Sequence, residues 1–238
     1  MPPGTTAAID RELDRAMASS ALLAGLPAKP VADLAARGHL RQYRRGTYLF
    51  HQGDPSEEVY FLWKGRIEVS SLSFTGHRQL HTTLDRPQFF GELGVLGGLV
   101  RTATAAAMED STVWVTRGEV FVEFLSQHFE ATRALLSALA GQIQAHESFV
   151  EDLLFLDLKG RVAKRLLQLV SPSLDDLPPD GTVIPSVVTH ADLASLCGGS
   201  RENVTRILSE LQRRQLVARD GRRYALTNVA GLRRLAGL

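Results

Sequence analysis

The spacing of apolar side chains divides the chain into regions of different periodicity. Residues 8–24 carry apolar side chains at helical spacing, and a second short helix is expected after Pro27. From Leu40 to Thr116, short runs rich in β-branched and aromatic residues alternate with turn signals. The predicted strands are Thr47–Phe50, Val59–Leu62, Ile67–Leu72, Leu80–Leu84, Thr102–Ala107 and Thr112–Thr116. This pattern predicts an antiparallel sandwich or jelly roll of about eight strands.

The period becomes helical from Glu119 onward. A helix is expected over Glu119–Ser126, and a long one from about Phe129 to Leu156. Its apolar positions keep a 3–4 spacing, with His146 in the missing slot; they are Leu136, Leu139, Ile143, Val150 and Leu153. Such a stripe is typical of a parallel dimer seam, and the alternative is a helix that lies on its own sheet.

The sequence pattern in the last third of the chain predicts a winged helix-turn-helix. After a helix over Gly160–Val170 and a loop rich in proline and acids, two short helices are expected, Ala191–Cys197 and Ser200–Arg213. The second helix has one apolar face, formed by Val204, Ile207, Leu208 and Leu211. A hairpin follows it, with strands Leu216–Ala218 and Tyr224–Leu226. A helix pair followed by a hairpin places its second helix in the major groove of DNA.

Composition adds the expected class and location. The chain has 238 residues with 44% apolar content, which suggests two domains of unequal size. Residues 1–8 lack a signal peptide and predict a loose tail, and no apolar run could span a bilayer. A cytoplasmic protein without a membrane contact is therefore expected. The single cysteine, Cys197, is expected to be a core residue.

Charge is distributed unevenly along the chain. The net charge is +1, but residues 201–238 hold nine arginines against three acids, which gives +6 there and −5 for residues 1–200. A basic end on an acidic body suits a polyanionic partner, and the alternative is a solvated arginine-rich tail.

Candidate binding chemistry lies in the glycine-rich stretch Phe89–Ala103. Its glycines allow exposed backbone N–H groups, which can form an anion-binding concavity. Arg101 and Thr102 offer a guanidinium and a hydroxyl to a phosphate, and Glu92 could accept hydrogen bonds from ribose hydroxyls. A salt bridge between Glu92 and Arg101 among glycine turns is the alternative.

Three motifs together resemble a known family. GELG followed by Arg-Thr-Ala resembles the phosphate-binding cassette of cyclic-nucleotide-binding domains, while FLDLKGRVAKRLLQL (Phe155–Leu169) and SRENVTRIL (Ser200–Leu208) resemble the hinge and recognition helix of the bacterial CRP/FNR regulators. The resemblance covers about residues 20–230. It implies an α+β fold with a tail or helix at 1–18, a β-roll at 19–127, a dimerisation helix at 128–157 and a winged helix-turn-helix at 158–238.

The resemblance implies a cyclic nucleotide effector, with cyclic AMP as the first expectation. Glu92 would hold the ribose 2′-hydroxyl, Arg101 and Thr102 the cyclic phosphate, and Gly91 and Leu93 would contribute backbone groups. The chain departs from the cyclic-AMP-responsive pattern on the long helix, where His146-Glu147 replaces a Thr-Ser or Thr-Asn pair. His146 could also set the dimer register or respond to pH, and Glu147 could accept from an adenine amino group. Ligand-independent binding, cyclic GMP and cyclic di-GMP therefore remain alternatives.

For DNA, the resemblance implies a homodimer on a two-fold site with TGTGA-like half-sites. Arg201, Glu202 and Arg206 match the base-contacting trio, since arginine is bidentate to guanine and glutamate accepts from cytosine. Backbone contacts are expected from Thr189, Ser200, Asn203 and the wing residue Arg222. RNA polymerase is a further expected partner. The sequence holds no metal-ligand, haem-ligand or catalytic constellation, so no metal, no cofactor and no enzyme activity are expected.

Overall fold

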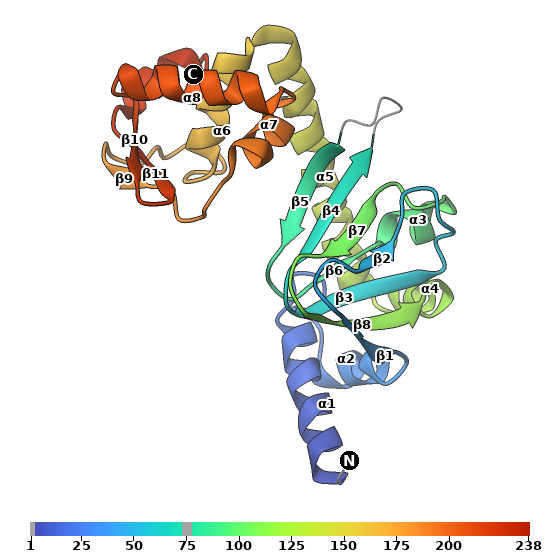
Figure 1. Cartoon of the computed structure of the whole chain (residues 1–238). Coiled ribbons are helices and arrows are strands. Elements are labelled where there is room, and N and C mark those ends of the chain that lie inside the picture. The colour runs from blue at the N-terminus through green and yellow to red at the C-terminus, as the bar shows by residue number, and fades with distance from the viewer. Residues whose placement is uncertain (1–2, 73–77) are drawn as a thin grey trace. The chain divides into compact units, whose positions relative to one another are not determined.

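A computed structural model of the chain describes residues 3–72 and 78–238 (Figure 1). The chain forms two compact units, Met1–Gln142 and Ile143–Leu238. Each unit has its own hydrophobic core, which for the second unit includes Leu166, Leu193 and Leu208. The two units are described separately below.

The first unit is an antiparallel β-roll of two four-stranded sheets, with strand orders β1-β8-β3-β6 and β2-β7-β4-β5 in the described residues. Its strands are β1 (His39–Tyr43), β2 (Tyr48–Phe50), β3 (Glu58–Lys64), β4 (Ile67–Leu72), β5 (Arg78–Leu84), β6 (Gln88–Phe90), β7 (Thr104–Ala107) and β8 (Ser111–Arg117). Its helices are α1 (Pro3–Ala18), α2 (Ala28–Ala35), α3 (Glu92–Gly97), α4 (Gly118–Gln127) and the start of α5 (Phe129–Phe155).

Strand β3 shows how alternation builds the roll. Successive side chains of a strand point to opposite faces, so a strand buried on both faces is apolar throughout. Val59 and Phe61 pack in the cluster formed with the helices, whereas Tyr60 and Leu62 pack in the cluster between the sheets. On β8, the buried Trp114 donates its indole N–H to Ala35 O at 2.9 Å, which fastens α2 to this face.

The second unit is a winged helix-turn-helix. Its helices are the end of α5, α6 (Leu158–Gln168), α7 (His190–Cys197), α8 (Arg201–Arg213) and α9 (Val229–Leu235). Strands β9 (Thr182–Val183), β10 (Val217–Asp220) and β11 (Arg223–Leu226) form one sheet in the order β10-β11-β9. Thr189 and Asp192 form a capping box at the start of α7, and Ser200 caps α8 through Asn203 N.

Helix α5 belongs to both units. Its first turns pack in the β-roll core through Ala131 and Leu135, with Leu139 partly buried beside them. Farther along, Asp152 and Lys164 form a largely buried ion pair of 2.6 Å between α5 and α6. Arg161 donates to Leu156 O and to Cys197 O, both at 2.8 Å, and so joins the ends of α5 and α7.

The predicted fold class, an α+β fold with an antiparallel β-roll and a winged helix-turn-helix, is confirmed. The boundaries placed at 18/19, 127/128 and 157/158 stay predictions. The compact units themselves meet inside α5, between Gln142 and Ile143. No helix within 3–72 and 78–238 is long and apolar enough to cross a bilayer.

The predicted N-terminal helix is confirmed over residues 8–18, but its bounds were wrong. Helix α1 begins at Pro3, within the stretch expected to be a loose tail, and ends at Ala18 instead of continuing to residue 24. Proline suits a helix start, and Leu13 and Met17 bury one face of α1 in the β-roll core. Residues 1 and 2 lie outside the described part of the chain.

Several short elements were not predicted. Strand β1 was missed because its residues, His39–Tyr43, are mostly polar; it pairs with β8 alone at the edge of its sheet. Strands β6 and β9 span three and two residues, too few to show a period. Helices α3 and α9 span six and seven residues.

Candidate functional site

The glycine-rich stretch of the β-roll begins with a sharp turn at Gly91. Gly91 has φ of +77°, in the left-handed region that favours glycine. A Cβ at this position would lie 2.9 Å from Arg101 Nη1 and 3.1 Å from Tyr60 Cδ2. Only glycine therefore lets the backbone approach the guanidinium of Arg101 this closely.

Among the described residues of the β-roll, Arg101 is the one charged residue that is almost fully buried, with a relative exposure of 4%. Its Nη1 donates to Gly91 O at 2.6 Å and its Nη2 to Glu58 O at 2.7 Å. The guanidinium lies 4.2 Å from the ring centre of Phe50 and 5.3 Å from that of Tyr60. Its Nε is buried and has no hydrogen-bond partner in the described structure. A buried donor without a partner is costly, so the site has an unfilled hydrogen-bonding direction.

Glu92 is half-buried at the first position of α3. Burial raises the pKa of its carboxyl, while a hydrogen bond from its own backbone and the charge of Arg101 act in the lowering direction. The sequence left open a Glu92–Arg101 salt bridge, but the guanidinium donates instead to two backbone carbonyls. Leu93 and Thr102 are exposed beside them.

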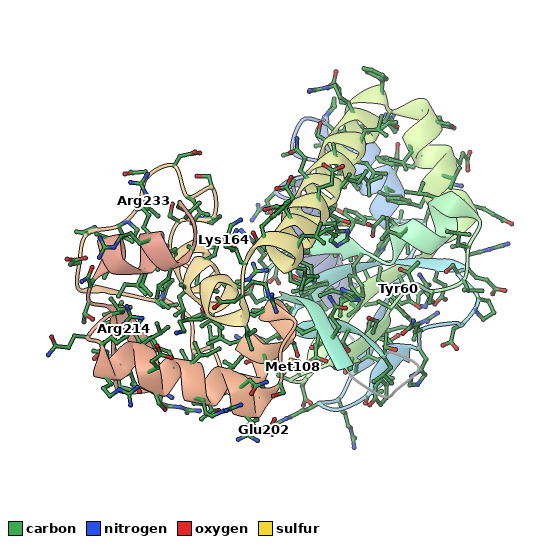
Figure 2. All side chains as sticks on the ribbon, turned by 90° about the horizontal axis from the view of Figure 1, so that it is seen from above. Tyr60, Met108, Lys164, Glu202, Arg214 and Arg233 are labelled. Atoms are coloured by element: carbon green, nitrogen blue, oxygen red, sulfur yellow. The ribbon has the colours of Figure 1, made fainter. Side chains whose placement is uncertain are left out.

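The position of Arg101 depends on residues that the sequence did not single out. Glu58 supplies the carbonyl that accepts from Nη2, while its carboxylate accepts from Arg41 and from Tyr60 Oη, the latter at 2.9 Å. Tyr60 lies inside the roll (Figure 2). The continuous apolar run of β3 is typical of a buried strand, but only the fold places Tyr60 beside an arginine 41 positions away.

His146 and Glu147 are exposed on α5, in the second unit, whereas Glu92 and Arg101 belong to the first. Their expected part in the ligand site stays a prediction.

The expected DNA-contacting side chains lie together on the solvent side of α8. Val204, Leu208 and Leu211 are buried in the core, while Arg201, Glu202 and Arg206 are exposed. Figure 2 shows Glu202 pointing outward from the first turn of α8. The guanidinium of Arg206 hydrogen-bonds Asn203 Oδ1 one turn earlier. Thus Asn203 orients Arg206, a contact that the sequence did not indicate.

The expected phosphate contacts come from three places around α8. Thr189 and Ser200 are exposed N-cap residues of α7 and α8, and Arg222 is exposed at the turn between β10 and β11. The Thr189 hydroxyl donates to Asp192 Oδ2 at 2.7 Å and accepts from Asp192 N at 3.1 Å. The sequence missed one connection beside this surface, in which the half-buried His190 and the buried Tyr224 join α7 to the wing.

Other chemistry is limited in the described residues. Cys197 is buried in the core, and burial raises the pKa of its thiol to about 11, which suits an unreactive packing residue. No group of three or more potential metal ligands occurs in the part of the chain that the structure describes.

Comparisons with known proteins agree with this geometry. A family model described as a cyclic nucleotide-binding domain matches residues 40–128, and one described as a Crp-like helix-turn-helix domain matches residues 160–235. The cAMP-activated global transcriptional regulator CRP of Pasteurella multocida is 30% identical over 77% of this chain and 88% of its own length. The chain belongs to the CRP/FNR family.

This CRP/FNR regulator is also similar to more distant relatives. The CRP-like cAMP-activated global transcriptional regulator of Mycobacterium tuberculosis is 24% identical over 94% of this chain and 100% of its own length. The solved structure of the c-di-GMP responsive global regulator CLP of Xanthomonas campestris has a TM-score of 0.69 at 24% identity and covers 84% of this chain and 99% of that one. The chain is thus a DNA-binding transcription regulator with a cyclic nucleotide-binding domain, and not an enzyme.

Proposed function

We propose that the regulator is a homodimer whose affinity for DNA is set by a cyclic nucleotide, cyclic AMP first, bound at Arg101. The observation that carries this proposal is the state of that arginine: it is nine-tenths buried, with an unpartnered Nε. A positive charge in such surroundings favours an anionic ligand, and a phosphate accepts hydrogen bonds in several directions. The relatives named as cAMP-activated support the same class of ligand.

Each residue has a distinct part in this proposal. Arg101 and Thr102 hold the cyclic phosphate, with backbone groups from Gly91 and Leu93. Glu92 accepts from the ribose 2′-hydroxyl; because burial raises its pKa, a hydrogen-bond donor at this place stabilises its charged form. His146 and Glu147 of α5 are the proposed contacts to the base.

The dimer is supported by the exposed apolar side chains of α5. Leu136, Ile143 and Val150 are each more than half exposed, at 59%, 59% and 53%. They lie seven residues apart, the repeat with which two helices pair. Leu139, the other early member of the predicted stripe, instead packs against its own β-roll. The seam we propose therefore runs through Leu136, Ile143 and Val150.

On DNA, we propose that Arg201, Glu202 and Arg206 contact base edges, while Thr189, Ser200, Asn203 and Arg222 fix the backbone. The exposure of the trio and the burial of the opposite face of α8 support these roles. Two such helices, about 34 Å apart in a dimer, would contact successive major grooves. RNA polymerase is the protein partner that a regulator bound beside a promoter would meet.

A second candidate is a regulator that binds DNA without a small molecule. It is favoured by one observation: both terminal nitrogens of Arg101 already donate to Gly91 O and Glu58 O. In that case backbone carbonyls of the protein take the place of a ligand at the terminal nitrogens of Arg101, and Glu92 and Thr102 have no ligand to hold.

Calorimetry distinguishes the two candidates. The purified full chain is titrated with cyclic AMP, cyclic GMP and cyclic di-GMP, and its affinity for a duplex selected from a random pool is measured with and without each. We expect saturable heat with cyclic AMP and tighter DNA binding in its presence. The Arg101→Ala variant should lose both effects, whereas Arg117→Ala, which removes an exposed arginine of the same unit, should retain them.

The opposite result is equally clear. No heat with any of the three nucleotides, together with DNA affinity that ignores them, would support the ligand-independent regulator. Sedimentation tests the dimer, since Ile143→Glu should yield a monomer while Glu151→Gln should not change the oligomeric state.

A further inference from the structure

His190 connects three elements of the winged helix-turn-helix. It is the first residue of α7 and is half-buried. Its Nδ1 lies 2.9 Å from Thr205 Oγ1 of α8, and its Nε2 lies 2.8 Å from Tyr224 Oη of β11. One imidazole ring therefore bridges the recognition helix and the wing.

The direction of these hydrogen bonds fixes the form of the ring. Thr205 Oγ1 donates its only hydrogen to Arg201 O at 2.8 Å, so it must accept from His190 Nδ1–H. In a neutral ring the other nitrogen then has a lone pair, which accepts from the hydroxyl of Tyr224. The geometry thus places a proton on Nδ1, and in the neutral tautomer Nε2 is the acceptor.

The connection continues to the tip of the wing through Arg219. Its guanidinium lies 4.2 Å from the ring centre of Tyr224, and its Nη2 lies 3.3 Å from His190 Nε2. Its Nη1 donates to Arg222 O at 3.3 Å, at the exposed turn of the hairpin. A continuous series of contacts therefore leads from the backbone of α8 to the residue proposed to contact phosphate.

We propose that neutral His190 is a positioning residue that fixes the wing relative to the recognition helix. This inference rests on the proposed function, in which α8 and Arg222 contact the same DNA. The wing must present Arg222 at one distance from α8 for both contacts to form together. His190 would thereby act on DNA through other residues, without touching it.

Charge makes the neutral form a requirement. The charged groups that face His190 are Arg219 of β10 and Arg201 of α8, and Tyr224 of β11 is a further titratable group beside it. On the helix of His190 itself, the carboxylate of Asp192 accepts a hydrogen bond from Thr189. A proton on Nε2 would set two cationic donors 3.3 Å apart and displace Arg219. Burial first, and then Arg219 and Arg201, lower the pKa of His190.

The sign of the pH effect follows from that lowered pKa. The stabilising contribution of the neutral ring is complete above the ordinary histidine pKa of about 6.5. It is lost as pH falls from there through the lower pKa that His190 has in the folded protein. The wing should therefore be held in place at neutral pH and loosen in acid.

The first arm of the test uses the free full chain without DNA. Selective ¹⁵N-histidine spectra, with the His190→Gln variant for assignment, should show the neutral Nδ1–H tautomer at pH 7.5. Backbone hydrogen exchange at 217–226 should rise in His190→Gln, and also in Tyr224→Phe, which removes only the hydroxyl. The exposed His51→Gln variant is the control and should leave exchange unchanged. The other tautomer, or unchanged exchange in both variants, would overturn the inference.

The second arm measures DNA affinity on a duplex selected by the wild-type protein. Arg222→Ala should weaken binding about two- to tenfold in the wild-type background and lower the salt slope by about one. In the His190→Gln background the same substitution should have little effect, because the wing no longer presents Arg222 correctly. Merely structural support from His190 would leave the effect of Arg222→Ala unchanged, which would overturn the positioning role.

The two proposals fail in different ways. If Arg222→Ala leaves wild-type affinity unchanged, the proposed phosphate contact of the wing is wrong. The position of the wing is judged separately by exchange in the free protein.

Discussion

Arg101 in the β-roll and Arg206 on the recognition helix are the same residue type in opposite surroundings. Arg101 is 4% exposed, lies beside two aromatic rings and donates to two backbone carbonyls. Arg206 is exposed, and the contact that the structure gives it comes from Asn203 on its own helix. Contacts across the fold therefore hold the first guanidinium, whereas a neighbour on the same helix orients the second.

This difference separates two kinds of recognition. A buried arginine with one free hydrogen-bonding direction selects a ligand that matches a rigid site. An exposed arginine on a helix keeps its side-chain freedom until it meets a base edge, so its contribution depends on the sequence of the DNA. Substitution of the first should change folding and binding together, and substitution of the second should change binding alone.

The largest expected effect is that of Arg101→Ala on stability. The substitution removes hydrogen bonds to Gly91 O and Glu58 O and two cation–π contacts, and should lower the free energy of unfolding by about 2–4 kcal/mol. Urea denaturation followed by tryptophan fluorescence measures this. Arg117→Ala is the matched control, since a surface substitution changes stability by less than about 0.5 kcal/mol. An equally small change for Arg101→Ala would remove the contrast between the two arginines.

A smaller effect is expected for Arg206→Ala, and it should appear only on DNA. The variant should lose about 1–3 kcal/mol of binding free energy on the preferred duplex and relax selectivity at one base position. Its free energy of unfolding should change by less than about 0.5 kcal/mol. Binding to single-base variants of the duplex measures this, with Arg213→Ala at the far end of α8 as the control. Equal loss on every duplex would assign Arg206 to phosphate instead.

The smallest effect concerns pH, which should act on the two units in different ranges. In the β-roll, burial of Glu58 acts to raise its pKa, but hydrogen bonds from Arg41 and Tyr60 outweigh burial and lower it. The contribution of Glu58 to stability is thus complete above about pH 4.5 and falls below it, whereas that of His190 already begins to fall below about pH 6.5. Glu92, whose pKa is raised, acts in the opposite sense and favours the folded β-roll in acid.

The positions of the tryptophans allow that comparison in one sample. Trp63 and Trp114 are the two tryptophans of the chain, and both lie in the β-roll core. Fluorescence therefore follows the β-roll alone, while circular dichroism follows both units. Between pH 7 and 5.5 the dichroism transition should shift to lower urea by well under 1 M and the fluorescence transition should not. A shift of the fluorescence transition alone would reverse the assignment.

Periodicity was sufficient for the elements that bury a continuous face. The apolar run of β3, the apolar face of α8 and the long period of α5 each predicted the observed element, and the glycine-rich stretch with Arg101 marks the proposed ligand site. The sequence could not show that Arg101 donates to Glu58 O, because that hydrogen bond joins residues 43 positions apart. Nor could it show the role of His190, whose partners come from α8 and β11.

The boundary between the two units inside α5 determines where domains could be exchanged between this chain and its relatives. The last turns of α5 belong to the DNA-binding unit, where Leu153 lies against the left-handed turn at Gly198 and a Cβ there would be 3.3 Å from its Cδ2. A sensor from one relative would therefore be joined to this unit within the helix, near Gln142, and not at its end. Such a joint must preserve helical phase, because each inserted residue rotates everything after it by about 100°. An insertion of about seven residues would restore the original face, whereas one of two residues would turn it away.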